Sequence, residues 1–82
     1  MMNQTLEFRP LVDYQENAKV HVIKIDTDSK TQVRILGMGI GNGSTITVMR
    51  NRSGDMVLAK NNIRISLGRS IAEKIFVEQV AE

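Results

Sequence analysis

Residues 44–67 read STITVMRNRSGDMVLAKNNIRISL, and this stretch decides the fold. Its last five residues, Ile63-Arg64-Ile65-Ser66-Leu67, alternate apolar and polar side chains, which is typical of a strand with one buried face. Two earlier segments, 44–51 and 56–60, also favour strands, and turn residues separate the three segments: Ser53-Gly54-Asp55 and Asn61-Asn62. The stretch therefore predicts an antiparallel meander.

Further strands and a short helix are predicted on either side of the meander. Residues 18–26 are rich in β-branched side chains, and their alternation slips by one residue between Val22 and Ile23, which predicts a β-bulge. Residues 31–38 place Val33 and Leu36 at helical spacing and are followed by a glycine, so we expect two turns of helix.

The segment after the meander predicts a short helical turn and a final strand. Ser70 and Glu73 have the spacing of a capping box, in which each side chain accepts a hydrogen bond from the main-chain N–H of the other residue. Residues 75–80 are mostly apolar and are expected to form the last strand.

Together these elements predict a mainly β protein: a small, strongly bent barrel of about five strands, with one short inserted helix and a helical turn before the last strand. Closing the sheet would remove its exposed edges. Residues 1–9 read as a loosely ordered extension, because Pro10 lacks an N–H and should break regular pairing, and residues 10–82 are expected to form one domain. The predicted inner layer is aliphatic: Val20, Val22, Ile46, Val48, Ile63, Ile65, Leu67, Ile75 and Val77.

Composition limits the possible functions. A chain of 82 residues has room for one domain and little room for a deep pocket that holds both a cofactor and a substrate. The absence of cysteine excludes disulfides, thiolate metal sites and cysteine nucleophiles, and favours a reducing, cytoplasmic compartment. The N-terminus has no signal-peptide pattern, and the longest uncharged run, residues 35–49, is too short and glycine-rich to span a membrane.

The charge is distributed unevenly. The net charge is only +2, but between positions 50 and 69 Asp55 is the single acidic residue among five basic ones: Arg50, Arg52, Lys60, Arg64 and Arg69. This segment indicates either a solvated sheet face or a patch for an acidic partner.

No catalytic or cofactor-binding motif is present. The glycines of residues 37–43 fall at every second position and precede a strand, whereas a dinucleotide fingerprint needs G-x-G-x-x-G before a helix. His21 is the single histidine, and its strand neighbours Val20 and Val22 should point to the opposite face. We therefore expect no enzymatic activity, no cofactor and no metal site.

Three segments in order resemble the FeoA family of small ferrous-iron-transport proteins. Residues 34–43, RILGMGIGNG, resemble that family's R-L-x-x-[LM]-G-[IL]-x-P-G segment, with Asn42 in place of the proline. Ile46-Thr47-Val48 and the turn at Gly54 resemble the strand and hairpin that follow, and residues 65–77, ISLGRSIAEKIFV, resemble the closing I-x-L-x-R-x-x-A-x-x-I-x-V. The resemblance implies an SH3-like barrel and a cytosolic, non-catalytic accessory of FeoB, the membrane iron permease with a GTP-binding domain.

Two other functions are compatible with the residues. The same SH3-like module forms the C-terminal domain of iron-dependent metalloregulators, and a basic β-barrel can bind RNA, although this chain has few aromatic residues for base stacking. For the FeoA interpretation, we expect the partner-binding face to lie on and beside the glycine bend. Its predicted members are Leu36, Met38, Gly39, Ile40, Gly43, Arg64 and Arg69. The alternative is that Leu36, Met38 and Ile40 are buried under the helix.

Overall fold

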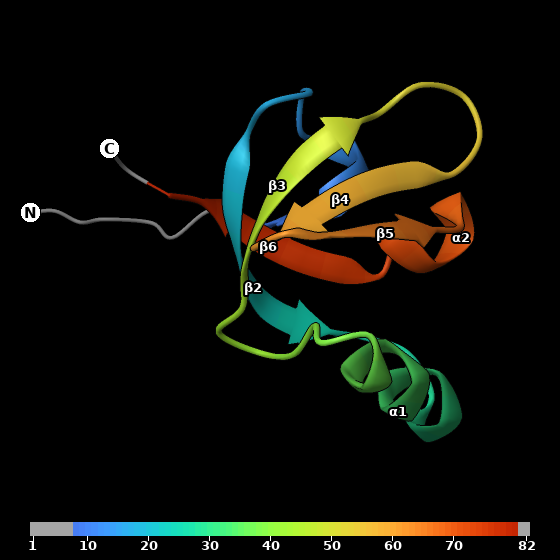
Figure 1. The fold of residues 1–82 in the computed structure, drawn as a ribbon. Helices are drawn as coiled ribbons and strands as arrows, with labels where there is room; N and C mark the ends of the chain where they lie inside the picture. Colours follow the sequence, from blue (N-terminus) through green and yellow to red (C-terminus); the bar gives the residue numbers. More distant parts are fainter. Residues whose placement is uncertain (1–7, 81–82) are drawn as a thin grey trace, which may run out of the picture.

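A computed structural model describes residues 8–80 and shows a bent β-sheet with two short α-helices (Figure 1). The elements follow one another along the chain as β1 (Arg9–Pro10), a 3-10 turn η1 (Leu11–Asp13), β2 (Lys19–Ile25), α1 (Ser29–Gly37), β3 (Thr45–Arg50), β4 (Met56–Lys60), β5 (Ile63–Leu67), α2 (Arg69–Ala72) and β6 (Ile75–Gln79). The mainly β, SH3-like prediction is confirmed, and the order of strands and helices is the predicted one with β1 added.

The six strands form one antiparallel sheet in the order β1-β6-β2-β3-β4-β5. The meander β3-β4-β5 pairs as expected, and the chain then returns so that β6 lies between β1 and β2. The sheet does not close through hydrogen bonds, because β1 and β5 are its edges and are not paired with each other. The expectation that closure removes both edges is therefore wrong.

The strand registers contain two irregularities. The β2–β6 register shifts between Val22 and Lys24, which confirms the predicted bulge in β2. The β3–β4 register shifts between Val48 and Arg50, and the sequence pattern gave no sign of this second irregularity. The β4–β5 hairpin turns at Asn61, whose φ of 57° is one that asparagine tolerates better than most residues.

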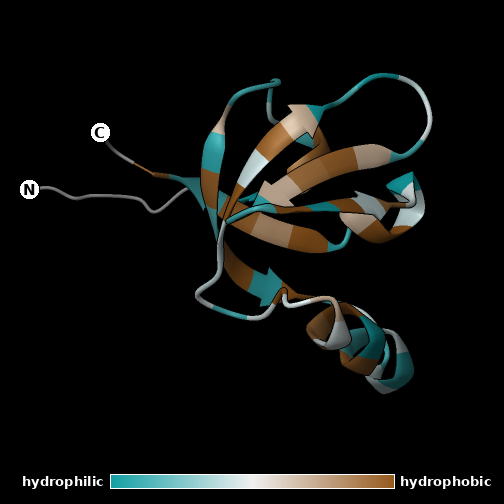
Figure 2. Ribbon diagram, viewed as in Figure 1, coloured by the Kyte–Doolittle hydropathy of each residue, from teal (hydrophilic) through white to brown (hydrophobic). Residues whose placement is uncertain are grey.

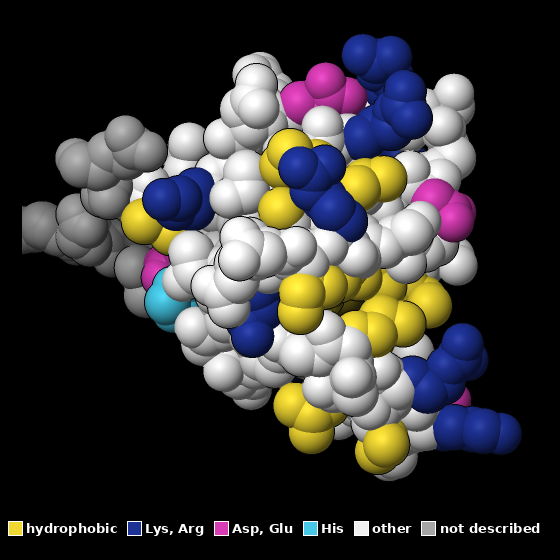
Figure 3. Space-filling model, viewed as in Figure 1, with side chains coloured by type: hydrophobic (Ala, Val, Ile, Leu, Met, Phe, Trp, Pro, Cys, Tyr) yellow, Lys and Arg dark blue, Asp and Glu magenta, His cyan; other side chains and the backbone are white. Residues whose placement is uncertain are grey.

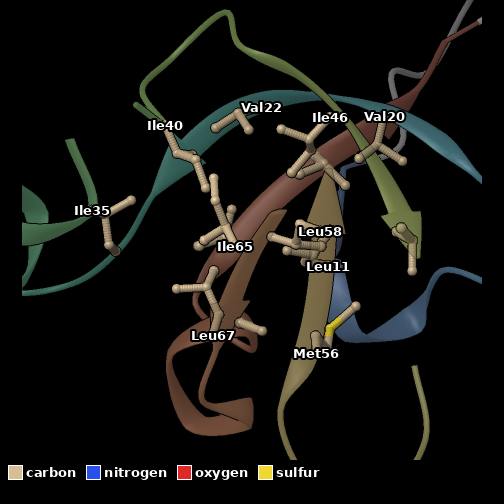
Figure 4. Packing of buried hydrophobic residues seen from close by; sticks show 14 residues of the cluster. Leu11, Val20, Val22, Ile35, Ile40, Ile46, Met56, Leu58, Ile65 and Leu67 are labelled. Carbon is tan, nitrogen blue, oxygen red and sulfur yellow. The ribbon is translucent and has the colours of Figure 1, made fainter. Parts of the chain in front are cut away.

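Eight of the nine predicted inner residues are buried, and the exception is Ile63, which is 60% exposed. Ile63 begins β5 directly after the turn, so its side chain lies beyond the edge of the core although it is in phase with Ile65 and Leu67. Figure 2 shows hydrophobic residues along the strands, and Figure 4 shows them meeting inside the sheet. Six further buried residues complete the core: Leu11, Ile35, Ile40, Met56, Leu58 and Ala72.

Pro10 does not break the pairing at the N-terminal end of the domain. Arg9 and Pro10 lie opposite Val77 and Phe76 in an antiparallel pair. Because β1 is an edge strand, the missing N–H of Pro10 can face outward at no cost to the sheet. Arg9 of the predicted 1–9 extension is thus part of the sheet, and residues 1–7 lie outside the described residues.

The predicted capping box at Ser70 is wrong. Helix α2 begins at Arg69, its N-cap is Gly68, and no side chain caps it. Ser70 is therefore the second residue inside the helix, two positions beyond the N-cap, where the box requires the serine. The helix instead continues directly from the end of β5, and Ala72 packs into the core.

Candidate functional site

Helix α1 stands beside the sheet and carries most of the candidate surface (Figure 1). It begins two residues earlier than predicted, because Asp28 Oδ1 accepts a hydrogen bond from the Thr31 N–H at 3.0 Å and so caps the first turn. The Thr31 side chain, which also hydrogen-bonds to this carboxyl, and the Thr31 N–H together hold the pKa of Asp28 below its usual value. A second link comes from Gln32 Nε2, which donates to the Ile25 and Thr27 carbonyls and holds the helix against the end of β2.

The end of α1 is a Schellman motif, and this motif decides where Ile40 points. The Gly39 N–H donates to Leu36 O at 2.8 Å, and the Ile40 N–H donates to Ile35 O at 3.2 Å. Gly39 has a φ of +92°, which a residue with a side chain rarely adopts. The motif brings Ile40 onto Ile35, and both are buried in the core, where Figure 4 shows Ile40 pointing inward. Ile40 is therefore a core residue and not, as predicted, part of an exposed docking face.

The glycine bend after α1 is fixed to β2 through its backbone. The Gly43 N–H donates to Val22 O, and the Val22 N–H donates to Ser44 O, each at 2.8 Å. Ser44 Oγ in turn accepts from the Gly41 N–H at 3.0 Å. Gly43 adopts a φ of +90°, so the bend depends on glycine there. The bend presents a defined surface and is not a slack loop.

The exposed apolar side chains lie on and next to α1. Val33 is 68% exposed, Leu36 64% and Met38 38%, so the alternative that Leu36 and Met38 are buried under the helix does not hold. Ile35 supplies the buried face of the helix instead. Figure 3 shows apolar side chains standing out from the outer side of α1, with basic side chains at the end of the helix.

An open groove of about 440 Å³ separates α1 from the end of β2. Val33 and Leu36 form its helical wall, and Ile25 and Ile40 lie on the opposite side. Lys24 is the charged residue among those that line the groove. Apart from the four aliphatic residues, the rest of the lining is uncharged polar residues and glycine. The bend lies close to the helix here, since a Cβ added at Gly41 would come within 3.2 Å of Leu36 Cδ1.

The basic hairpin β4–β5 reaches the other side of the glycine bend. A Cβ added at Gly39 would lie 3.8 Å from Lys60 Nζ, which places the end of β4 beside the bend. Lys60 is paired with Ile63, and Arg64 follows as an exposed residue of β5. Arg64 lies opposite Ala59, so its side chain is on the other face of the hairpin from Lys60, and its place on the docking face stays a prediction.

Arg69 is used inside the molecule. Its Nη1 donates to Arg52 O at 2.7 Å and to Gly54 O at 3.2 Å, and its Nη2 donates to Asn51 Oδ1 at 2.7 Å. These bonds hold the β3–β4 loop against α2. Arg69 therefore has a structural role in this loop, and its predicted place on the docking face stays a prediction.

Asn51 joins this loop to the segment between η1 and β2. Its Nδ2 donates to Val12 O at 2.8 Å and to Tyr14 O at 2.6 Å, while its main-chain N–H donates to Glu16 Oε2 at 3.0 Å. That N–H, together with the Arg52 guanidinium 3.3 Å from the same oxygen, holds the pKa of Glu16 below its usual value. The sequence did not suggest this network.

Metal and catalytic groups are sparse in the part of the chain that the structure describes. Among residues 8–80, no three histidine, aspartate or glutamate side chains gather closely enough to hold a metal ion. His21 is partly exposed on β2, and its Nδ1 lies 3.2 Å from Thr45 Oγ1. Within the same residues, no helix is long and apolar enough to cross a bilayer.

Comparisons with known proteins identify the fold and its relatives. A family model described as the FeoA domain matches residues 9–79. A protein of Methanocaldococcus jannaschii named as an Fe(2+) transport protein A is 38% identical over 69 residues, which cover 84% of each chain.

Solved structures with this fold include a FeoA-like protein and a part of a transcriptional repressor. The solution structure of a FeoA-like protein from Clostridium acetobutylicum has a TM-score of 0.80 at 29% identity, covering 95% of this chain and 93% of that one. A manganese-dependent transcriptional repressor has a TM-score of 0.84 at 24% identity, covering 94% of this chain but 44% of the repressor, so this likeness concerns the fold of one part of that protein.

Proposed function

Because the chain belongs to the FeoA family, we propose that it is a non-catalytic accessory protein of ferrous iron uptake that works at the cytoplasmic side of the membrane. In this proposal it acts by binding the cytosolic part of a FeoB-type, GTP-binding iron permease. Ferrous iron is then the cargo of the permease, and this protein contributes a binding surface and no reaction step.

The observation that carries the proposal is the exposed aliphatic surface at the end of α1. Leu36 and Met38 stand in solvent beside a bend that hydrogen bonds hold to β2. Neighbouring apolar side chains that are exposed mark a candidate interaction site, and a preorganised backbone favours binding because little ordering is needed when the partner binds. Lys60 beside the bend adds positive charge that favours an acidic partner.

Two observations make RNA binding the weaker alternative. Of the five basic residues between positions 50 and 69, Arg69 is hydrogen-bonded to the β3–β4 loop and Arg52 is paired with Glu16. Stacking of bases also requires exposed aromatic rings, and Phe8 is the single large aromatic side chain that is exposed among residues 8–80.

Capture of the permease tests the proposal. Detergent-solubilised FeoB-type permease from the same organism is passed over immobilised wild-type protein and over Met38→Glu, which places a charge in the proposed surface. Phe8→Glu is the matched control, because Phe8 is also exposed and precedes β1, which is separated from β2 by β6. Retention by the wild type and by Phe8→Glu, with loss in a folded Met38→Glu, is the expected result. Failure of the wild type to retain the permease, or retention of RNA in its place, would overturn the proposal.

A further inference from the structure

The groove between α1 and β2 has apolar walls and basic borders. Lys24 lines the groove on the β2 side. On the helix side, Lys30 lies three residues before Val33 and therefore next to it on the helix surface, whereas Arg34 lies three residues after Thr31, on the side of α1 away from the groove. The groove thus combines an aliphatic interior with positive charge along both sides.

These cations have no anionic partner of their own. Within the described residues 8–80, neither Lys24 nor Lys30 nor Arg34 forms an ion pair. Lys30 and Arg34 also have the i, i+4 spacing at which like charges on a helix repel each other. A hollow on the other side of α1 is different, because the carboxyl-bearing Asp26 and Asp28 line it together with Lys74. An acidic segment bound in the groove would place negative charge near Lys30 and so relieve the repulsion between Lys30 and Arg34.

From this arrangement we propose that the groove binds one acidic amphipathic helix of the partner protein. The inference rests on the proposed function and adds to it the chemistry of the contact. Aliphatic side chains at i, i+3 and i+4 of the partner helix enter between Leu36, Val33 and Ile25, and Asp or Glu residues on its flanks face Lys24 and Lys30.

A helix is favoured over an extended strand as the occupant because of what the backbone offers. An added strand needs a row of free main-chain donors and acceptors. Beyond its contacts with β3 and the glycine bend, which end at Val22, β2 continues only to Ile25, and the Ile25 carbonyl already accepts from Gln32 Nε2. Recognition in the groove therefore depends on side chains, which is how a helix docks.

Charge reversal on a single strand provides the sharpest test. Lys24 and Lys19 are both exposed residues of β2, but Lys24 lines the groove and Lys19 lies at the other end of the strand. The dissociation constant of the permease's purified cytosolic region is measured by titration calorimetry at low and high salt. We expect Lys24→Glu to weaken binding about three- to tenfold at low salt and to flatten its salt dependence, while Lys19→Glu behaves as the wild type.

Leu36→Glu tests the apolar wall in the same assay. Leu36 is largely exposed, so the variant should keep its fold, which circular dichroism checks, and should lose more than about tenfold in affinity. Overlapping synthetic peptides from the cytosolic region of the permease then identify the bound segment. The expected peptide is acidic, becomes helical on binding, and shifts the amide signals of residues 24–42 in NMR spectra.

The possible failures are distinguishable. If the cytosolic region does not bind the wild type, both the proposed function and the groove inference fail. If it binds, and Lys24→Glu and Leu36→Glu bind as the wild type does, the function stands and the groove inference is overturned. Equal weakening by Lys19→Glu and Lys24→Glu would also overturn it, since general charge would then explain the effect. The inference would also be overturned if vesicles of phosphatidylcholine and phosphatidylglycerol shift the same amide signals and no peptide does, because the groove would then bind lipid.

Discussion

Replacing Asn51 by alanine is expected to destabilise the protein strongly, and more than replacing the polar side chains of Glu16 or Asn62. The change removes two donations to the main-chain carbonyls of Val12 and Tyr14 and the acceptor of the Arg69 guanidinium. A neutral hydrogen bond contributes about 1 kcal/mol net and one to a charged group about 1.5–3 kcal/mol. The three overlap and are partly solvated, so the expected loss in the free energy of unfolding is about 2–4 kcal/mol.

That loss is large for a domain of this size. At roughly 0.05–0.15 kcal/mol per residue, the whole domain is stable by about 4–12 kcal/mol. With about 4–8 °C of melting temperature per kcal/mol, Asn51→Ala should lower the melting temperature by about 10–25 °C. Thermal and urea unfolding followed by circular dichroism measure both quantities.

Asn62 provides a matched control. Asn62→Ala changes the same side chain at an exposed turn position, and its effect should stay within about 0.5 kcal/mol. Asn51→Asp separates the two halves of the network, because the carboxylate still accepts from Arg69 but cannot donate to Val12 O and Tyr14 O. A melting temperature of Asn51→Ala within two or three degrees of the wild type, or equal to that of Asn62→Ala, would refute this account of the network.

Three further variants test other parts of the structure. The pKa of Glu16 is lowered in the folded protein, so the ionised carboxylate stabilises the fold above its unfolded pKa of about 4.3, and this contribution is lost as the pH falls through the folded pKa. The difference in the free energy of unfolding between wild type and Glu16→Gln should therefore shrink below about pH 5. A difference that does not depend on pH would contradict this prediction. Leu67→Ala should cost about 2–5 kcal/mol in urea unfolding because Leu67 is buried, whereas Ile63→Ala should cost far less because Ile63 is largely exposed. Gly43→Ala should cost about 1–3 kcal/mol in thermal unfolding because of its positive φ, although an added Cβ meets nothing within 4 Å, and Gly37→Ala, equally open and helical, should be neutral or stabilising.

Local patterns in the sequence were enough to predict most of the sheet. Alternation identified β5, the phase slip at Val22 identified the bulge in β2, and Asn61 identified the hairpin turn. The errors occurred where position within the fold overrides the local pattern. Ile63 is in phase with the core but lies at the end of its strand, and Pro10 pairs because its strand is at the edge of the sheet.

The surface was harder to predict than the sheet. The sequence places Leu36, Met38 and Ile40 in one apolar, glycine-rich run, and the two hydrogen bonds of the Schellman motif decide that Ile40 turns inward while Leu36 stays in solvent. A hydrophobic contact between the residue after the glycine and the last turn of the helix commonly accompanies this motif, so the position of Gly39 contained a usable signal.

The Asn51 network contained no such signal. Its bonds join residues that are 18 to 39 positions apart in the sequence, and no local pattern relates Asn51 to Val12 or Arg69. Only the folded arrangement of η1, the β3–β4 loop and α2 brings them together. The sequence accordingly gave no sign that the Arg69 guanidinium binds the β3–β4 loop.

The pairing of Arg9 with Val77 makes the fold suitable as a module within longer chains. Because β1 and β6 are neighbouring antiparallel strands, the chain enters and leaves the sheet at adjacent points, whereas α1 and the glycine bend project elsewhere (Figure 1). Fusion to another domain at either end, or circular permutation that joins the two ends, should leave the groove unobstructed. The occurrence of this fold as 44% of a manganese-dependent transcriptional repressor fits such modular use, and affinity tags and fluorescent labels are best attached at these ends.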